Sequence, residues 1–109
     1  MIPAGDFNRI VVFLEPVQQR NADGRVTQSW EERFRAWAKV LPLRGGEQVM
    51  QARLAARTPA IVTIHSSERA RSVNAKWRVR VAGQLYDLKE EPREDMDASC
   101  FDILVESLS

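Results

Sequence analysis

The sequence predicts a mainly β, antiparallel fold of five or six strands with one short α-helix, arranged as a small barrel or a sandwich. Short β-branched and aromatic runs recur along the chain, and turn signals separate them at short spacing. Apolar and polar residues alternate within several of these runs, as expected of strands with one buried face. Good helix formers dominate one segment only, residues 45–58.

The first two predicted strands form a long hairpin. Residues 9–14 (RIVVFL) are apolar and too short for a helix before Pro16, so they predict a buried strand. Residues 33–41 place apolar side chains on one face and Arg, Trp and Lys on the other. The polar sequence NADG lies between the two strands, and its Asp-Gly pair is a strong turn signal. We therefore expect Asp23 and Gly24 to shape the tip of the hairpin.

The rest of the chain predicts one helix and four more strands. The helix, GGEQVMQARLAART, is weakly amphipathic and ends before Pro59. In the segment KWRVRVAG, Trp77 and two valines alternate with three cations, so Trp77 is expected to point into the core. A turn is expected at Gly83-Gln84. The predicted strands cover residues 60–66, 76–83, 85–91 and 99–107.

Length and composition predict one domain, residues 1–109, with an ordinary globular core. The apolar share is 44%, and 16 basic residues balance 15 acidic ones, so no overall charge calls for a nucleic-acid or membrane partner. The single cysteine, Cys100, excludes an internal disulfide framework. The N-terminus does not resemble a signal peptide, and no apolar run reaches the roughly 20 residues that span a bilayer.

The sequence offers no catalytic constellation, and we expect neither an enzyme nor a cofactor. His65 lies in a β-branched strand without a partner in a recognisable catalytic frame, and Cys100 is expected to be a small buried hydrophobe. One His and one Cys cannot complete a zinc site within one chain. Gly45-Gly46 lacks the remaining residues of a phosphate-binding loop.

Two charged segments are candidates for contacts between subunits. Residues 66–81 hold five basic side chains, and residues 87–97 hold six acidic ones. Such patches allow head-to-tail contact between copies, with Arg78 and Arg80 of one facing Glu90 and Glu91 of the next. Neutralisation between adjacent strands of one monomer is equally compatible with the pattern.

The order of several short motifs resembles the head–tail joining proteins of tailed phages. The motifs are GDFNRIVVFLEPV, a DG-type loop, W…RFRAWAKVLPLRGGE and W-x-V-x-V-x-G-x-x-Y-D-L, and together they cover nearly the whole chain. The matching residues are Gly5, Arg9, Ile10, Gly24, Trp30, Trp37, Ala38, Val40, Pro42, Leu43, Gly83, Tyr86 and Leu88. His65-Ser66 departs from the Arg-Tyr type of ending that the family often shows there.

The resemblance implies a structural role and a small antiparallel β-barrel with projecting loops. Such proteins form a homo-oligomeric ring of roughly six or twelve copies between the portal or adaptor and the tail terminator or tail protein. They act as stoppers that help retain the packaged DNA. The same part occurs in phages, prophages and gene transfer agents, so the expected location is the virion or phage-like particle, after synthesis in the bacterial cytoplasm. Trp30 is then expected to anchor a docking arm.

The resemblance also implies that residues 45–58 face the lumen of the ring, with Arg44, Arg53 and Arg57 near non-specific DNA phosphate. An ordinary solvent-facing helix explains these arginines equally well. The alternative function is a small β-barrel that binds single-stranded nucleic acid, because a basic strand beside Trp77 has the needed residue types. The alternation of that strand argues against this reading.

Overall fold

The computed structural model describes residues 7–43, 58–96 and 99–108. Their elements, in chain order, are β1 (Arg9–Arg20), β2 (Val26–Pro42), β3 (Pro59–His65), α2 (Glu68–Ser72), β4 (Arg78–Val81), β5 (Gln84–Leu88), β6 (Arg93–Glu94) and β7 (Cys100–Ser107). The mainly β class predicted from the sequence is confirmed. The helix predicted over residues 45–58 lies outside the described residues, apart from Thr58.

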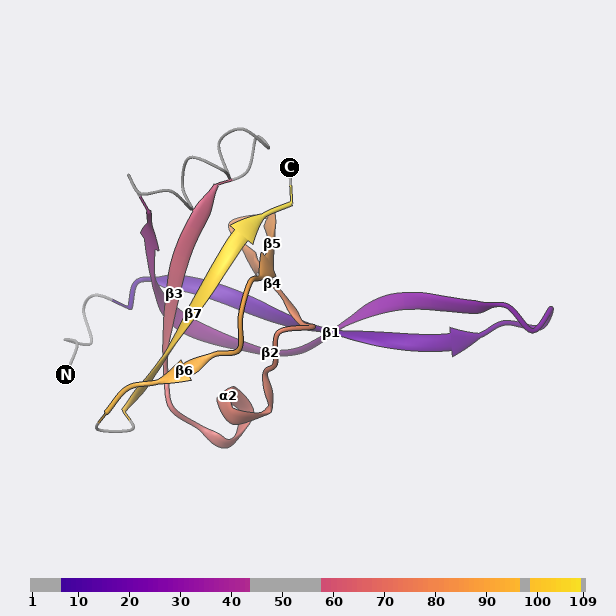
Figure 1. The fold of residues 1–109 in the computed structure, drawn as a ribbon, viewed down its shortest axis with the longest axis horizontal. Helices are drawn as coiled ribbons and strands as arrows, with labels where there is room; N and C mark the ends of the chain where they lie inside the picture. The colour runs from indigo at the N-terminus through magenta and orange to yellow at the C-terminus, as the bar shows by residue number, and fades with distance from the viewer. Residues whose placement is uncertain (1–6, 44–57, 97–98, 109) are drawn as a thin grey trace.

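The strands form one antiparallel sheet that closes on itself. The strand order is β3-β2-β1-β4-β5-β7-β6, and β3 also pairs with β7. β6 pairs with the start of β7 at Arg93↔Asp102 and Glu94↔Phe101, next to the stretch of β7 that pairs with β5. We call this arrangement the closed sheet. Closure gives most strands two neighbours, and it leaves the end of β1 and the start of β2 outside the closed sheet (Figure 1).

The core fills the inside of the closed sheet. Trp77 is 4% exposed, which confirms the prediction that it points inward. Phe13 stacks on Phe34 with ring centroids 4.7 Å apart, and Trp77 lies 6.4 Å from Phe34 in a tilted arrangement. Such aromatic contacts add to the stabilisation that area burial gives. The largest fully buried side chains are Phe13, Ile64, Ile103, Val11, Val62, Val79 and Val105.

The turn between β4 and β5 falls one residue earlier than predicted. Ala82 and Gly83 both have positive φ, +50° and +81°, and Gln84 already pairs with Val81. Positive φ at both central residues is the geometry of a type I′ hairpin, whose twist matches that of the flanking strands. Glycine suits the second position, and Ala82 adopts a conformation that L residues disfavour.

A short helix, α2, and the two-residue strand β6 were not predicted from the sequence. Ser67 caps α2 by accepting a hydrogen bond from the backbone N–H of Ala70 at 3.0 Å, and Glu68 lies in the first turn. Ser-Glu before an alanine is a recognisable helix start, but five residues are too few to show helical periodicity. Ala70 is buried and fixes α2 against the core.

Candidate docking site: the projecting arm and its base

Residues 15–31, which we call the arm, leave the closed sheet as a two-stranded ribbon. β1 pairs with both β2 and β4 as far as Leu14, and beyond that point its described partner is β2 alone, from Glu15↔Glu31 to Arg20↔Val26. The ribbon extends well away from the rest of the chain (Figure 1). The long hairpin predicted from the sequence is therefore confirmed. Pro16 is tolerated within it because the arm is an edge on both sides.

The tip of the arm is held by an asparagine rather than by the aspartate that the sequence singled out. Asn21 Oδ1 accepts hydrogen bonds from the backbone N–H groups of Asp23 at 3.1 Å and Arg25 at 2.9 Å. Gly24 has a φ of +81° and donates its N–H to the Asn21 carbonyl at 3.0 Å. Glycine is needed there because an L side chain disfavours that φ. Asp23 and Gly24 thus both lie at the exposed tip, as predicted.

A β-bulge marks the base of the arm. The register shifts between Phe13, which pairs with Phe34, and Leu14, which pairs with Glu32, so Arg33 is the extra residue. Bulges bend a strand and increase its local twist, which redirects the ribbon as it leaves the closed sheet. Arg33 is held on both sides, by Glu15 at 2.7 Å and Glu31 at 3.1 Å. The bulged residue therefore links the two strands of the arm through its side chain.

Trp30 joins the arm to β4, in agreement with the expectation that Trp30 anchors the arm. The guanidinium carbon of Arg78 lies 4.1 Å from the centroid of the Trp30 ring, which is cation–π geometry. Arg78 Nε also contacts Asp87 Oδ1 at 3.1 Å. Beside this stack is an open hollow of about 220 Å³, lined by Leu14, Trp30, Glu32, Arg78, Arg80 and Leu85. Sequence periodicity gave no signal for the stack, because Trp30 and Arg78 lie on different strands.

The charges expected to face a neighbouring subunit are paired within the chain. Arg78 contacts Asp87, Arg80 contacts Glu32, and Glu90 contacts Arg93 at 3.1 Å. Glu91 accepts a hydrogen bond from the backbone N–H of Ala75 at 3.2 Å. Arg78 and Arg80 are thus neutralised within the chain, which is one of the two alternatives that the sequence left open. The docking role of these four residues stays a prediction. Arg44, Arg53 and Arg57 lie outside the described residues.

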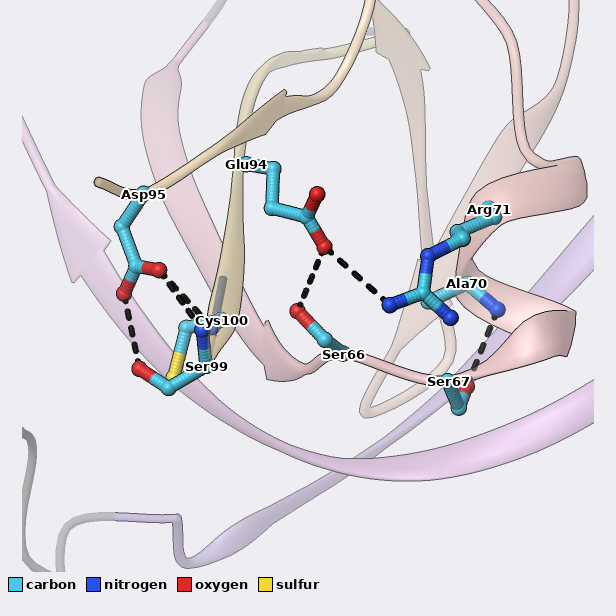
Figure 2. Close-up of polar contacts among 8 residues, drawn as sticks. All are labelled: Ser66, Ser67, Ala70, Arg71, Glu94, Asp95, Ser99 and Cys100. Atoms are coloured by element: carbon cyan, nitrogen blue, oxygen red, sulfur yellow. Dashed lines mark hydrogen bonds and ion pairs between the residues drawn. The ribbon is translucent and has the colours of Figure 1, made fainter. Parts of the chain in front are cut away.

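The acidic segment after β5 is held in place by hydrogen bonds to its own chain (Figure 2). Asp95 accepts from the backbone N–H of Ser99 at 2.8 Å and of Cys100 at 3.2 Å, and from the Ser99 hydroxyl at 3.0 Å. Glu94 accepts from the Ser66 hydroxyl at 3.0 Å and contacts Arg71 at 3.5 Å. Glu94 and Asp95, which belong to the acidic segment singled out in the sequence, are therefore held by contacts within their own chain.

The two residues considered for catalysis lie at the end of β3 and at the start of β7. Cys100 is 3% exposed, as predicted for a small buried hydrophobe, and the His65 ring stacks on Phe7 with centroids 4.1 Å apart. Across residues 7–43, 58–96 and 99–108, no three His, Cys, Asp or Glu side chains gather in a way that could hold a metal ion. In the same ranges, no helix has the length and apolar character to cross a membrane.

Comparison with known proteins identifies relatives in sequence and in fold. A family model described as phage head completion protein matches residues 2–106. The solution structure of protein SF1141 from Shigella flexneri 2a superposes with a TM-score of 0.76 at 18% identity, covering 99% of this chain and 98% of that one. A chain from the virion of a native gene transfer agent particle gives a TM-score of 0.65 at 19% identity, covering 93% of this chain and 94% of that one. No curated protein matches the chain in sequence.

Proposed function

Since this chain belongs to the phage head completion protein family and is a structural component of the virion, we propose that it closes the filled head as a subunit of a head–tail connector. In this proposal several copies form a ring, and the family resemblance implies roughly six or twelve of them. The ring lies between the portal or its adaptor and the tail terminator or tail protein, and it helps to retain the packaged DNA. The fold shared with a chain of a gene transfer agent virion supports this role.

The observation that carries the proposal is the free-standing arm. An isolated two-stranded hairpin is marginally stable in water, because it has no core of its own. The arm is nonetheless long, capped at its tip by Asn21 and held at its base by Arg33 and Trp30. These features fit a segment that is ordered in advance to contact a neighbouring protein, which lowers the entropic cost of docking. We propose that Asp23 and Gly24 lie in this contact.

The DNA-facing part of the proposal rests on the family resemblance. Arg44, Arg53 and Arg57 would line the lumen of the ring and screen phosphate charge without reading sequence. The alternative, a binder of single-stranded nucleic acid, needs exposed aromatic rings beside free cations. Trp77 is buried and both Arg78 and Arg80 have carboxylate partners, so that strand lacks the required surface.

The proposal is tested by shortening the arm without touching the closed sheet. Residues 18–28 are replaced by Asn-Gly, so that Val17 and Ser29, which already pair, become the ends of a type I′ hairpin. We expect the variant to keep its thermal unfolding midpoint, because none of the removed residues contributes to the buried core. Particles made with it should lack tails or lose DNA, measured by electron microscopy and by DNase sensitivity of the packaged genome.

A variant that changes the tip but not its length serves as the control. Ala22→Ser keeps the length of the arm and leaves Asn21 and Gly24 in place, so particles should form normally. Complete, DNA-filled and tailed particles from the shortened variant would contradict the docking role of the arm. Complete particles from a host that lacks the chain altogether would contradict the connector function itself.

A further inference from the structure

A second exposed surface lies on the outer side of β2. The exposed large hydrophobic residues of the described chain are Ile10, Val26, Trp37, Leu41 and Met96, with exposed fractions of 50%, 58%, 56%, 50% and 106%. Ile10 is paired directly with Trp37 across β1 and β2, and Leu41 lies four residues further along β2, on the same face as Trp37. We call residues Ile10, Arg35, Trp37, Lys39 and Leu41 the Trp37 face.

The Trp37 face is apolar at its centre and basic at its edges. Arg35 and Lys39 precede and follow Trp37 by two residues, so all three side chains project from the same side of the strand. The described contact of Arg35 is a long one, 3.6 Å to Glu32, and its side chain is 68% exposed. Exposed tryptophan and arginine are the side chains that most often dominate binding energy in protein interfaces. This composition fits a partner surface with an apolar centre and acidic edges.

The chain carries such a surface itself, in residues 90–96, which we call the Met96 loop. The loop holds four carboxylates against one guanidinium, and Met96 at its end is fully exposed. The Asp95 hydrogen bonds to Ser99 and Cys100 fix the backbone directly before Met96 (Figure 2). Glu91 and Glu94 are exposed on the same loop. Methionine sulfur makes favourable contacts with aromatic rings, so Met96 and a tryptophan are chemically matched.

The two surfaces belong to different strands of the closed sheet, although the loop also borders the end of β2, because Glu90 and Arg93 line an open hollow together with Leu43. Around the closed sheet the order is β1, β2, β3, β7, β5 and β4, and β6 continues the line of β5 along the edge of β7. Through β3 and β7, β6 is three strand pairings away from β2. Complementary surfaces at two different places on one subunit allow head-to-tail contacts, which can close into a ring.

We propose that the Met96 loop of one copy docks on the Trp37 face of the next copy, with Met96 against Trp37 and the acidic loop beside Arg35 and Lys39. The inference deepens the proposed ring and rests on it. A two-fold contact between two Trp37 faces is disfavoured, since it would bring Arg35 and Lys39 of both copies together. The basic side of this contact is β2. The carboxylates of the Met96 loop also have partners within their own chain, so the contact depends on the exposure of Glu91 and Glu94 rather than on unpaired charge.

Cysteine cross-linking tests the contact directly. The double variant Trp37→Cys with Met96→Cys is assembled into particles and also purified at high concentration, and both samples are treated with a short bismaleimide. We expect a ladder of cross-linked dimers, trimers and larger species on a denaturing gel. A mixture of the two single variants should stop at dimers, because each subunit then carries one reactive end. Cys100 is buried and stays unmodified in all samples.

Matched controls separate the possible outcomes. Val26→Cys with Met96→Cys is equally exposed but should give no ladder. Dimers from Trp37→Cys alone would show a two-fold contact, and absence of a ladder from both samples would likewise overturn the proposal. If complete particles form without the double variant, the connector function is contradicted. The cross-linking ladder of the purified chain then tests the proposed contact separately from that function.

Charge reversal gives an independent readout in the same assay. Lys39→Glu in the double-cysteine chain should lower the ladder yield by about threefold or more, because an attraction at the edge of the contact becomes a repulsion. Adding Glu91→Lys should restore the yield. Arg20→Glu, which changes an exposed cation in the arm, should leave it unchanged. Equal effects of Lys39→Glu and Arg20→Glu would contradict the placement of the contact.

Discussion

The arm and the closed sheet are built from the same two strands, but different forces hold them. Val11 and Phe13 on β1 are completely buried, whereas residues 18–20 of the same strand are exposed. The first half of β1 lies between β2 and β4, and the second half pairs with β2 alone. Burial stabilises the closed sheet, while the arm depends on main-chain hydrogen bonds and the ion pairs of Arg33.

This difference separates the closed sheet, which determines the global stability, from the arm, which is proposed to dock. A two-stranded ribbon with no core opens easily on its own, so its opening need not involve unfolding of the rest. Substitutions in the closed sheet should therefore change the global free energy of unfolding, and the same substitutions in the arm should change local opening only. Three pairs of substitutions test this separation.

The largest difference is expected for aromatic side chains. Phe13→Ala removes a fully buried ring stacked on Phe34 and should lower the free energy of unfolding by about 3–5 kcal/mol. Trp30→Ala, at the base of the arm, should lower it by only about 1 kcal/mol, through loss of the Arg78 contact. Urea unfolding followed by near-ultraviolet circular dichroism measures both. Equal losses would mean that the arm is part of the cooperative core.

Much of the closed sheet could be predicted from the sequence, because burial leaves a pattern of period two. The alternation in residues 76–83 correctly placed Trp77 and Val79 inside, and the Asp-Gly signal correctly placed the hairpin tip. The sequence did not predict the type I′ turn at Ala82, since alanine is unfavourable at positive φ and the turn is imposed by the strands around it.

The contacts of the candidate site were harder to predict, because they join residues that are distant in sequence. Arg80 meets Glu32 across 48 positions, and Arg33 is a bulge that strand periodicity cannot reveal. A charge pattern in the sequence shows which charges are present but does not show which residues they pair with. From the sequence, the basic segment 66–81 could pair either with a neighbouring subunit or within its own chain. The register of β4 with β5 places Arg78 opposite Asp87 and so gives the pairing within the chain.

A smaller difference is expected for a valine in each region. Val79→Ala removes two methyl groups from a fully buried position in β4, and it should lower the free energy of unfolding by about 2 kcal/mol. Val26→Ala, at a position that is 58% exposed near the arm tip, should change it by less than about 0.5 kcal/mol. The two midpoints of urea unfolding give the comparison. A large loss from Val26→Ala would show that the arm tip packs on something in the isolated chain.

The smallest and sharpest test uses two glycines with the same conformation. Gly24 at the arm tip and Gly83 between β4 and β5 both have a φ of +81°, and a Cβ added at either would meet nothing within 4 Å. Alanine therefore costs the same at both sites, roughly 1–2 kcal/mol of backbone strain, without any clash. Gly83→Ala should lower the global free energy of unfolding by that amount, because the β4–β5 turn is part of the closed sheet. Gly24→Ala should leave global unfolding unchanged and speed amide exchange in residues 15–31 about tenfold, since the strain is released when the arm opens by itself.

Hydrogen exchange with mass spectrometry and urea unfolding, applied to both variants, separate the two responses. Ala22→Gly provides the control for the arm, because it changes tip flexibility without imposing strain at positive φ. If Gly24→Ala lowered global stability as much as Gly83→Ala does, the arm and the closed sheet would unfold as one unit. The arm would then not be the separately opening, docking-ready segment that its pairing indicates. If exchange rises only in the arm, its order is independent of the core, and binding to a neighbour can tighten it without changing the fold.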